Sequence, residues 1–260
     1  MTRRPPALPS GAALPAHDAA SVREHWERLH ACDALPLPTD ERLLDAWTLY
    51  HQGDFLQAAE AGIAIGNAPG LAVANKAIAI HATYLEADEA ARLALLMEVA
   101  TRATELTTRA PDDPCAWYWQ AYALGRYSQG ISIARALAQG MAPRVRAALE
   151  KTLLLQPRHA DAHLALGMFH AEVIDKVGAL IGGMTYGARK DQGLRLLAEG
   201  LRLNPHSIIG RIEYANGLVM LEGEDRVPEA TRLYEQAATS TPLDATEWLE
   251  VALARAELED

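Results

Sequence analysis

Three histidines, His159, His163 and His170, come closer than any other side chains of this sequence to the spacing of a metal site. They are four and seven residues apart, which places them within about 60° of one another on one face of a helix. Three imidazoles on one face could bind zinc. No cysteine and no H-E-x-x-H pattern accompanies them. We therefore favour packing in places usually held by aromatic side chains, and we expect no metal and no cofactor.

A glycine-rich stretch from Gly178 to Lys190 is the second candidate site. It combines apolar residues and four glycines with Tyr186, Arg189 and Lys190. Such a stretch could lie over an apolar ligand and hold its acidic head group with these three side chains. The alternative, which we favour, is an extended helical hairpin in which the glycines relieve crowding, because the strand and the GK[ST] sequence of a phosphate loop are absent.

Four aromatic residues, Trp117, Tyr118, Trp119 and Tyr122, form a third candidate site just after Pro114. An exposed aromatic shelf could bind a peptide or an apolar ligand. The helical pattern places Trp117 in the core with Tyr122 beside it, so we favour core packing for the cluster. Trp119 is the member that we expect to be exposed and able to contact a ligand.

Motifs of enzymes are missing from the sequence. It has no nucleophile elbow, paired-carboxylate motif, kinase loop or dinucleotide fingerprint, so we predict a protein that is not an enzyme. The formal net charge of −10 argues against a nucleic-acid partner, because non-specific affinity for phosphates comes from clustered Lys and Arg. The two cysteines, Cys32 and Cys115, form no CxxC pair and indicate neither a disulfide framework nor a thiolate zinc site.

The elements that must position these residues are read from a recurring proline. Val and Ile are sparse beside Ala and Leu, and no stretch alternates with period two, so strands are disfavoured. Eight and twelve residues before the later prolines, an apolar or aromatic residue and a small or β-branched residue recur. The prolines are Pro111, Pro157, Pro205 and Pro242. Eight residues before the last three are Leu149, Leu197 and Tyr234, and twelve residues before them are Val145, Gly193 and Ala230. The pattern predicts an all-α fold of antiparallel helix pairs, each closed by a proline.

The segment His163-x2-Leu166-Gly167-x2-His170, followed by this proline pattern, resembles the tetratricopeptide repeat (TPR) superfamily. The resemblance implies a right-handed superhelix of antiparallel helix pairs. From Trp117 to Pro242 the chain is also similar to the repeat domains of the regulator-of-microtubule-dynamics family, some of whose members are thought to bind lipids or other hydrophobic ligands. It resembles transporter-associated bacterial repeat proteins as well. Those are lipoproteins, whereas no apolar run precedes Cys32 here.

Two repeats are longer than the standard one. Successive prolines are 46, 48 and 37 residues apart, while the standard period is about 34 residues, so two repeats carry roughly 12 and 14 additional residues. These insertions lie between the two helices of a repeat, at residues 125–135 and 173–190. Insertions in such arrays usually line one face, often the binding face.

The expected domain organisation is simple. Residues 1–20 are rich in Pro and Ala and predict a disordered arm, while residues 21–260 predict a single helical-repeat domain that begins with a helix over 21–31. The final helix, Asp244 to Leu258, is interpreted as a polar cap. Charge-free stretches are too short to span a bilayer, and no secretory signal is evident, so a cytoplasmic location is predicted.

These observations favour a non-enzymatic scaffold that binds a protein or peptide partner in a concave groove, because this is the usual use of a repeat array. The alternative is a carrier of a hydrophobic small molecule or lipid. In that case the insertions would close over an apolar pocket, and Tyr186, Arg189 and Lys190 would hold the polar end of the ligand.

Overall fold

The computed structural model describes residue 14 and residues 16–259, in which helices and turns occur but no strand. The helices are α1 Ala19–Glu24, α2 Trp26–Leu29, α3 Glu41–Gln52, α4 Phe55–Ile65, α5 Ala68–Tyr84, α6 Glu89–Arg109, α7 Pro114–Gln129, α8 Ile133–Ala138, α9 Met141–Leu155, α10 Ala160–Tyr186, α11 Lys190–Leu203, α12 Ile208–Glu222, the short 3-10 helix η1 Glu224–Arg226, α13 Val227–Ala238 and α14 Ala245–Leu258. The predicted all-α class is confirmed. Within the described residues, no helix combines the length and apolarity that a membrane crossing requires.

The recurring prolines mark helix ends, as predicted. Pro111 lies two residues after the end of α6, Pro157 two residues after α9 and Pro205 two residues after α11. Proline has no backbone N–H and restricts the residue before it to extended conformations, so it cannot continue these helices. The C-terminal member, Pro242, follows α13 after a short turn.

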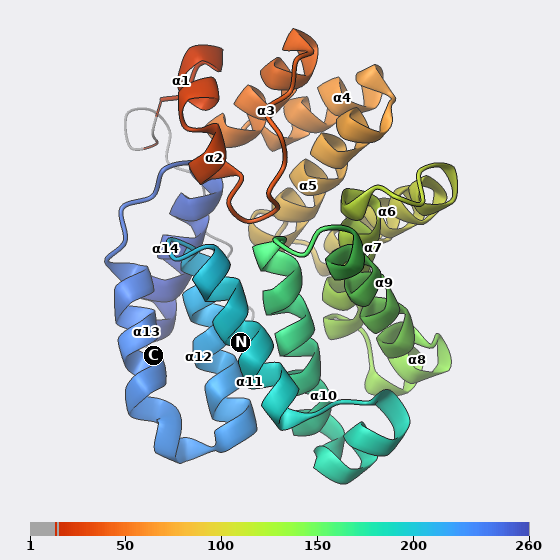
Figure 1. The fold of residues 1–260 in the computed structure, drawn as a ribbon, viewed down its shortest axis with the longest axis vertical. Helices are drawn as coiled ribbons and strands as arrows, with labels where there is room; N and C mark the ends of the chain where they lie inside the picture. The colour runs from red at the N-terminus through yellow and green to blue at the C-terminus, as the bar shows by residue number, and fades with distance from the viewer. Residues whose placement is uncertain (1–13, 15, 260) are drawn as a thin grey trace. The chain divides into compact units, whose positions relative to one another are not determined.

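Contacts between residues divide the chain into two compact units. Unit 1 contains the residues up to His30, Leu35–Lys151 and Pro242–Leu249, and unit 2 contains Ala31–Ala34, Thr152–Thr241 and the residues from Glu250 onward. In unit 1, α3 packs on α4, α4 on α5, α5 on α6 and α6 on α7. In unit 2, α10, α11, α12 and α13 lie side by side in chain order (Figure 1). The organisation as one repeat domain stays a prediction.

Glycines set the close approach of α10 and α11 in unit 2. A Cβ atom added at Gly167 would lie 2.7 Å from Cγ of Leu197 and 3.0 Å from its backbone nitrogen. One added at Gly200 would lie 2.5 Å from Cγ of Leu164. Leu164 and Leu197 are both buried, in a cluster that also contains Met168, Ala171 and Leu221. The small residue of the TPR-like pattern at Gly167 therefore lets two helices approach.

Residues 16–20 are ordered, although the sequence predicted that they belong to a disordered arm. The side chain of Asp18 accepts a hydrogen bond from the backbone N–H of Ser21 and caps α1. His17 is buried and its Nε2 donates to the backbone oxygen of Leu243 at 2.7 Å. The predicted disorder is thus wrong for residues 16–20, because His17 packs within unit 1, and the rest of the predicted arm lies outside the described residues except for position 14. The helix expected over 21–31 is divided into α1 and α2 at His25.

The second insertion extends a helix and then bends it. In α10, Gly178 has φ 80° and ψ 157°, which is not helical and lies in a region that L side chains rarely adopt. Residues 179–186 continue as a separate helical arm that ends at Gly187, with φ 65°. This is the extended hairpin that the sequence favoured. The first insertion contains the end of α7 and the first residues of the short helix α8.

The C-terminal helix is not a polar cap. Leu249, Val251 and Ala254 of α14 are buried, and so are the acidic residues Asp244 and Glu250. In unit 2, Val251 and Ala254 pack with apolar residues of α12 and α13. The acidic residues of this segment suggested a solvent-facing helix, but Asp244 and Glu250 are buried and form hydrogen bonds.

Candidate functional site

An open depression of about 530 Å³ on unit 2 is the candidate functional site. It lies along the seam where α10 packs against α11. Five of its six lining residues lie at the start of α11 or on that helix, and one is on α10. They are Arg189, Gln192, Arg195, Leu196, Glu199 and His163.

The helical period explains why these residues line one surface. Arg189 is the N-cap of α11, and the other lining residues of this helix follow it at spacings of three or four. Such residues share one face of a helix. The buried residues Gly193, Leu197 and Gly200 lie on the neighbouring face, about 120° away around the helix, and pack against α10. The sequence of α11 therefore separates a polar face, which lines the depression, from an apolar one.

The charges of the depression are unequally engaged. The guanidinium of Arg189 donates to Oε1 of Gln192 at 3.1 Å, and Arg195 forms an exposed ion pair with Asp191 at 3.3 Å. The carboxylate of Glu199 accepts two hydrogen bonds from the guanidinium of Arg202, of 2.6 and 2.7 Å. These hydrogen bonds lower the pKa of Glu199 below its ordinary value. Glu199 is paired with Arg202 and Arg195 with Asp191, so Arg189, which contacts only a neutral amide in this group, leaves the depression with a positive charge.

A buried histidine fixes the backbone of Arg189. Nδ1 of His170 accepts a hydrogen bond from the backbone N–H of Arg189 at 3.2 Å, and His170 is completely buried. The start of α11 is thereby tied to the middle of α10. This contact joins two residues that the sequence treated as members of different candidate sites.

The three candidate histidines perform separate structural tasks. His159 caps α10 by accepting a hydrogen bond from the backbone N–H of Ala162 on Nδ1, at 3.2 Å. Nε2 of His163 donates to the backbone oxygen of Pro157 at 3.0 Å. In the part of the chain that the structure describes, no three His, Cys, Asp or Glu side chains are arranged to hold a metal ion. His163 alone among them lines the depression.

The expected exposure of Trp119 is wrong. Its side chain is only 5% exposed and packs edge-on against Tyr118 and Tyr122, with ring centroids 4.9 and 5.2 Å apart. Trp117, which was expected in the core, is half-buried, and its Nε1 donates to the backbone oxygen of Pro111 at 2.9 Å. The two tryptophans exchange roles because α7 packs against both α5 and α6, so more of its surface is buried than a single helix contact would cover.

The remaining predicted ligand-binding residues lie beside the depression and do not line it. Tyr186 is half-buried at the end of the arm, and Lys190 is exposed at the start of α11. Nζ of Lys190 forms an ion pair with Oε1 of Glu222, on α12, at 3.4 Å. Of Tyr186, Arg189 and Lys190, the structure places only Arg189 in the depression.

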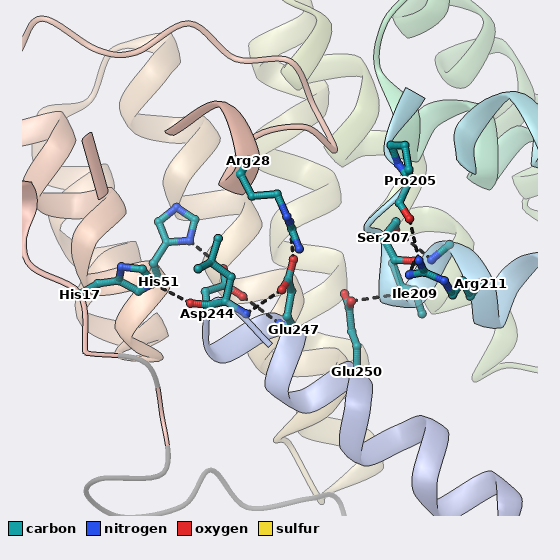
Figure 2. Close-up of polar contacts among 12 residues, drawn as sticks. His17, Arg28, His51, Pro205, Ser207, Ile209, Arg211, Asp244, Glu247 and Glu250 are labelled. Atoms are coloured by element: carbon teal, nitrogen blue, oxygen red, sulfur yellow. Dashed lines mark hydrogen bonds and ion pairs between the residues drawn. The ribbon is translucent and has the colours of Figure 1, made fainter. Parts of the chain in front are cut away.

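A buried polar network in unit 1 was not predicted (Figure 2). Nδ1 of His51, on α3, lies 2.7 Å from Oδ2 of Asp244, and the two side chains are 1% and 7% exposed. Burial lowers the pKa of His51 below its ordinary value, although Asp244 acts in the opposite direction. Burial also disfavours the charged form of Asp244, but the hydrogen bond and charge of His51, the backbone N–H of Glu247 and the charge of Lys76 together outweigh it and leave the pKa of Asp244 lowered. Near this pair, Arg28 and Glu247 form an ion pair at 2.6 Å.

Unit 2 has its own buried carboxylate at the start of α12 (Figure 2). Oε2 of Glu250 accepts a hydrogen bond from the backbone N–H of Ile209 at 3.1 Å, while Ser207 caps the same helix by accepting from the backbone N–H of Gly210. Carboxylate oxygens near a helix N-terminus satisfy backbone N–H groups that have no partner within the helix. These contacts stabilise the helix and leave no group free for chemistry on a ligand.

Comparison with known proteins gives a fold and no closer relationship. No family model matches the chain. No curated protein matches it either. Among solved structures, it is similar to a thermophilic TPR protein of Thermus thermophilus, with a TM-score of 0.57 and 18% sequence identity over 83% of this chain and 98% of that chain. At this identity the likeness shows the fold alone: the chain has the all-α, helical-repeat fold of TPR proteins.

Proposed function

We propose that this protein is a non-enzymatic helical-repeat scaffold that binds an acidic segment of a protein partner in the depression between α10 and α11. The observation that carries the proposal is the charge of this surface. A chain with a formal net charge of −10 presents Arg189 and Arg195 at an open depression, where the carboxylate of Glu199 is already bound by Arg202.

Arginine suits such a role. Its planar guanidinium donates two parallel hydrogen bonds to a carboxylate, which gives both strength and a defined orientation. The weak partners that these arginines now have, a neutral amide for Arg189 and an exposed Asp191 for Arg195, are exchangeable at little cost because exposed ion pairs contribute about 0–1 kcal/mol. Leu196 adds an apolar side chain to the lining of the depression.

The second candidate function is a carrier of a hydrophobic molecule, and the apolar side chains of the second insertion bear on it. The insertion that was expected to cover a ligand carries large apolar side chains, Leu180, Ile181 and Met184, but all three are exposed. Native mass spectrometry of the purified protein tests this candidate. A co-purified apolar molecule at near-stoichiometric level would favour the carrier. The likeness to the regulator-of-microtubule-dynamics family and the cytoplasmic location also stay predictions.

The scaffold is tested by fluorescence anisotropy with a labelled, glutamate-rich synthetic peptide. We expect the Arg189→Glu/Arg195→Glu variant to bind this peptide about tenfold more weakly than the wild type or worse. Wild-type affinity should also fall as salt is added, because the charges are exposed. Arg158→Glu/Arg232→Glu is the control matched for charge, since both are exposed arginines of the same unit and neither lines the depression. Equal losses in both variants would show that only net charge matters and would refute the site.

A further inference from the structure

The helical arm, residues 179–186, has its small residues inside and its large apolar residues outside. Gly182 is buried, and a Cβ atom added there would lie 3.3 Å from Cγ1 of Val173 and 3.6 Å from Cβ of Ala188. One added at Gly183 would lie 3.5 Å from the backbone oxygen of Ala188. The arm therefore packs on the body of unit 2 through its glycines.

The opposite face of the arm is apolar and open to solvent. Leu180 is 76% exposed, Ile181 55% and Met184 82%. Leu180 and Met184 are one helical turn apart, so together with Ile181 they form one contiguous apolar surface. A helix that serves only to close a fold buries such side chains. Clustered exposure of large apolar residues marks a surface that a partner covers.

Charge around the arm indicates the chemistry of that partner. Three basic residues flank the arm: Lys176 pairs with Glu172 and Lys190 with Glu222, whereas the guanidinium of Arg189 contacts the neutral amide of Gln192. Arg189 follows the end of the arm by three residues and lines the depression, so the arm and the cationic side chain are neighbours along the chain. The side chains on α11 from Arg189 to Glu199 extend over about 15 Å, which corresponds to about ten residues of a helix.

Other occupants match these charges less well. A flat bilayer would contact the exposed side chains of the arm but would not enter the depression that Arg189 and Arg195 line. The arm of a second copy of this chain would present the same basic residues and be repelled. A protein segment with apolar residues on one side and acidic residues on the other complements both surfaces.

We infer that the arm is the second half of the binding surface and that the partner segment is an acidic amphipathic helix. Its apolar side chains contact Leu180, Ile181 and Met184, and its carboxylates bind Arg189 and Arg195. The inference rests on the proposed function and adds to it the class of segment that is recognised. Methionine suits the contact because its flexible side chain adapts to different partners.

Two labelled synthetic peptides of 21 residues and equal negative charge test this inference. A helix of this length spans about 30 Å, enough to reach over both surfaces. The first peptide has leucines at spacings of three and four residues, and the second has serines in their place. We expect the wild type to bind the leucine peptide about tenfold more tightly than the serine peptide. Leu180→Ser/Met184→Ser should remove that preference and leave binding of the serine peptide unchanged.

The outcomes separate the inference from the function on which it depends. If the wild type binds both peptides equally, or if the double variant keeps the preference, the arm is not the apolar subsite, whereas the scaffold stands. If neither peptide binds the wild type, the proposed function fails and the inference fails with it. Sedimentation with vesicles of phosphatidylcholine and phosphatidylserine tests the other occupant: wild-type binding that the double variant loses would assign the arm to a bilayer and overturn the inference. Circular dichroism of the variant checks its fold, which should not change because both side chains are mostly exposed.

Discussion

Nδ1 of His51 lies 2.7 Å from Oδ2 of Asp244, and the two residues are 193 positions apart in the chain. Both are nearly inaccessible to solvent. The hydroxyl of Thr246 donates to the hydroxyl of Tyr50 at 2.9 Å, next to this pair. The last segment of unit 1, Pro242–Leu249, is therefore attached to α3 by buried hydrogen bonds.

This pair makes stability depend on pH. The pKa of His51 is lowered in the folded protein, so below about pH 6.5 the unfolded chain binds a proton that the folded chain excludes. Stability is therefore complete above this pH and decreases as the pH falls from there toward the folded pKa, by at most about 1.4 kcal/mol per pH unit for one proton. Urea unfolding between pH 8 and pH 5 should show this loss for the wild type and a weaker one for His51→Gln. A flat wild-type profile would contradict it.

Two carboxyl groups extend this pH dependence in opposite directions. The pKa of Asp244 is lowered, so its contribution is present above its ordinary pKa and is lost as the pH falls further. Burial and the neighbouring Asp244 raise the pKa of Glu247. The folded state therefore holds the proton of Glu247 more tightly than the unfolded chain does, and this contribution to stability is lost as the pH rises from the ordinary pKa of Glu247 through its raised pKa. His51 and Lys76 both favour the ionised form of Asp244, and Lys76 and His17 disfavour a proton on His51.

Removal of the buried carboxylate should destabilise the protein strongly. Asp244→Ala leaves the buried ring of His51 without this acceptor and removes the cap of α14, and the expected cost is about 3 kcal/mol. The control is Glu41→Gln in the same unit, where Glu41 pairs with Arg23 and is 72% exposed. The control should change stability by less than about 1 kcal/mol. Chemical denaturation measures both, and a similar small effect for the two variants would show that the buried pair is unimportant.

Two glycine substitutions test the packing of the repeat helices. Gly167→Ala places a Cβ atom 2.7 Å from Leu197 and should destabilise by about 1–3 kcal/mol. Gly125→Ala, in α7, meets no atom within 4 Å and should stabilise by about 0.5–1 kcal/mol through helix propensity. Thermal unfolding distinguishes the two signs. Destabilisation of equal size at both sites would argue against a close approach specific to Gly167.

The sequence predicted helix ends better than it predicted contacts. Proline acts locally, so Pro157 and Pro205 mark the ends of α9 and α11 wherever those helices pack. Trp117 and Trp119 differ by about 200° around a helix, and which of them is buried depends on the neighbours of α7. No local pattern contains that information, and it was assigned incorrectly.

The candidate site was predicted only in part, for a similar reason. Arg189 was named from composition, and it lies in the depression. Arg195, Gln192 and Leu196 were missed, although their spacing from Arg189 on one face of α11 was a usable signal. The role of His170 was not predictable, because its hydrogen bond to the backbone of Arg189 depends on how α10 and α11 pack.

Exchange of charge tests the central claim, the recognition of an acidic segment by Arg189 and Arg195, most directly. The measurement is the anisotropy titration of wild-type and Arg189→Glu/Arg195→Glu protein, each with a glutamate-rich peptide and with the same peptide in which lysine replaces glutamate. We predict that the wild type prefers the glutamate peptide and that the variant prefers the lysine peptide, because reversed charges at the depression favour the reversed ligand. If both proteins show the same preference, the depression does not bind the segment and the account is wrong.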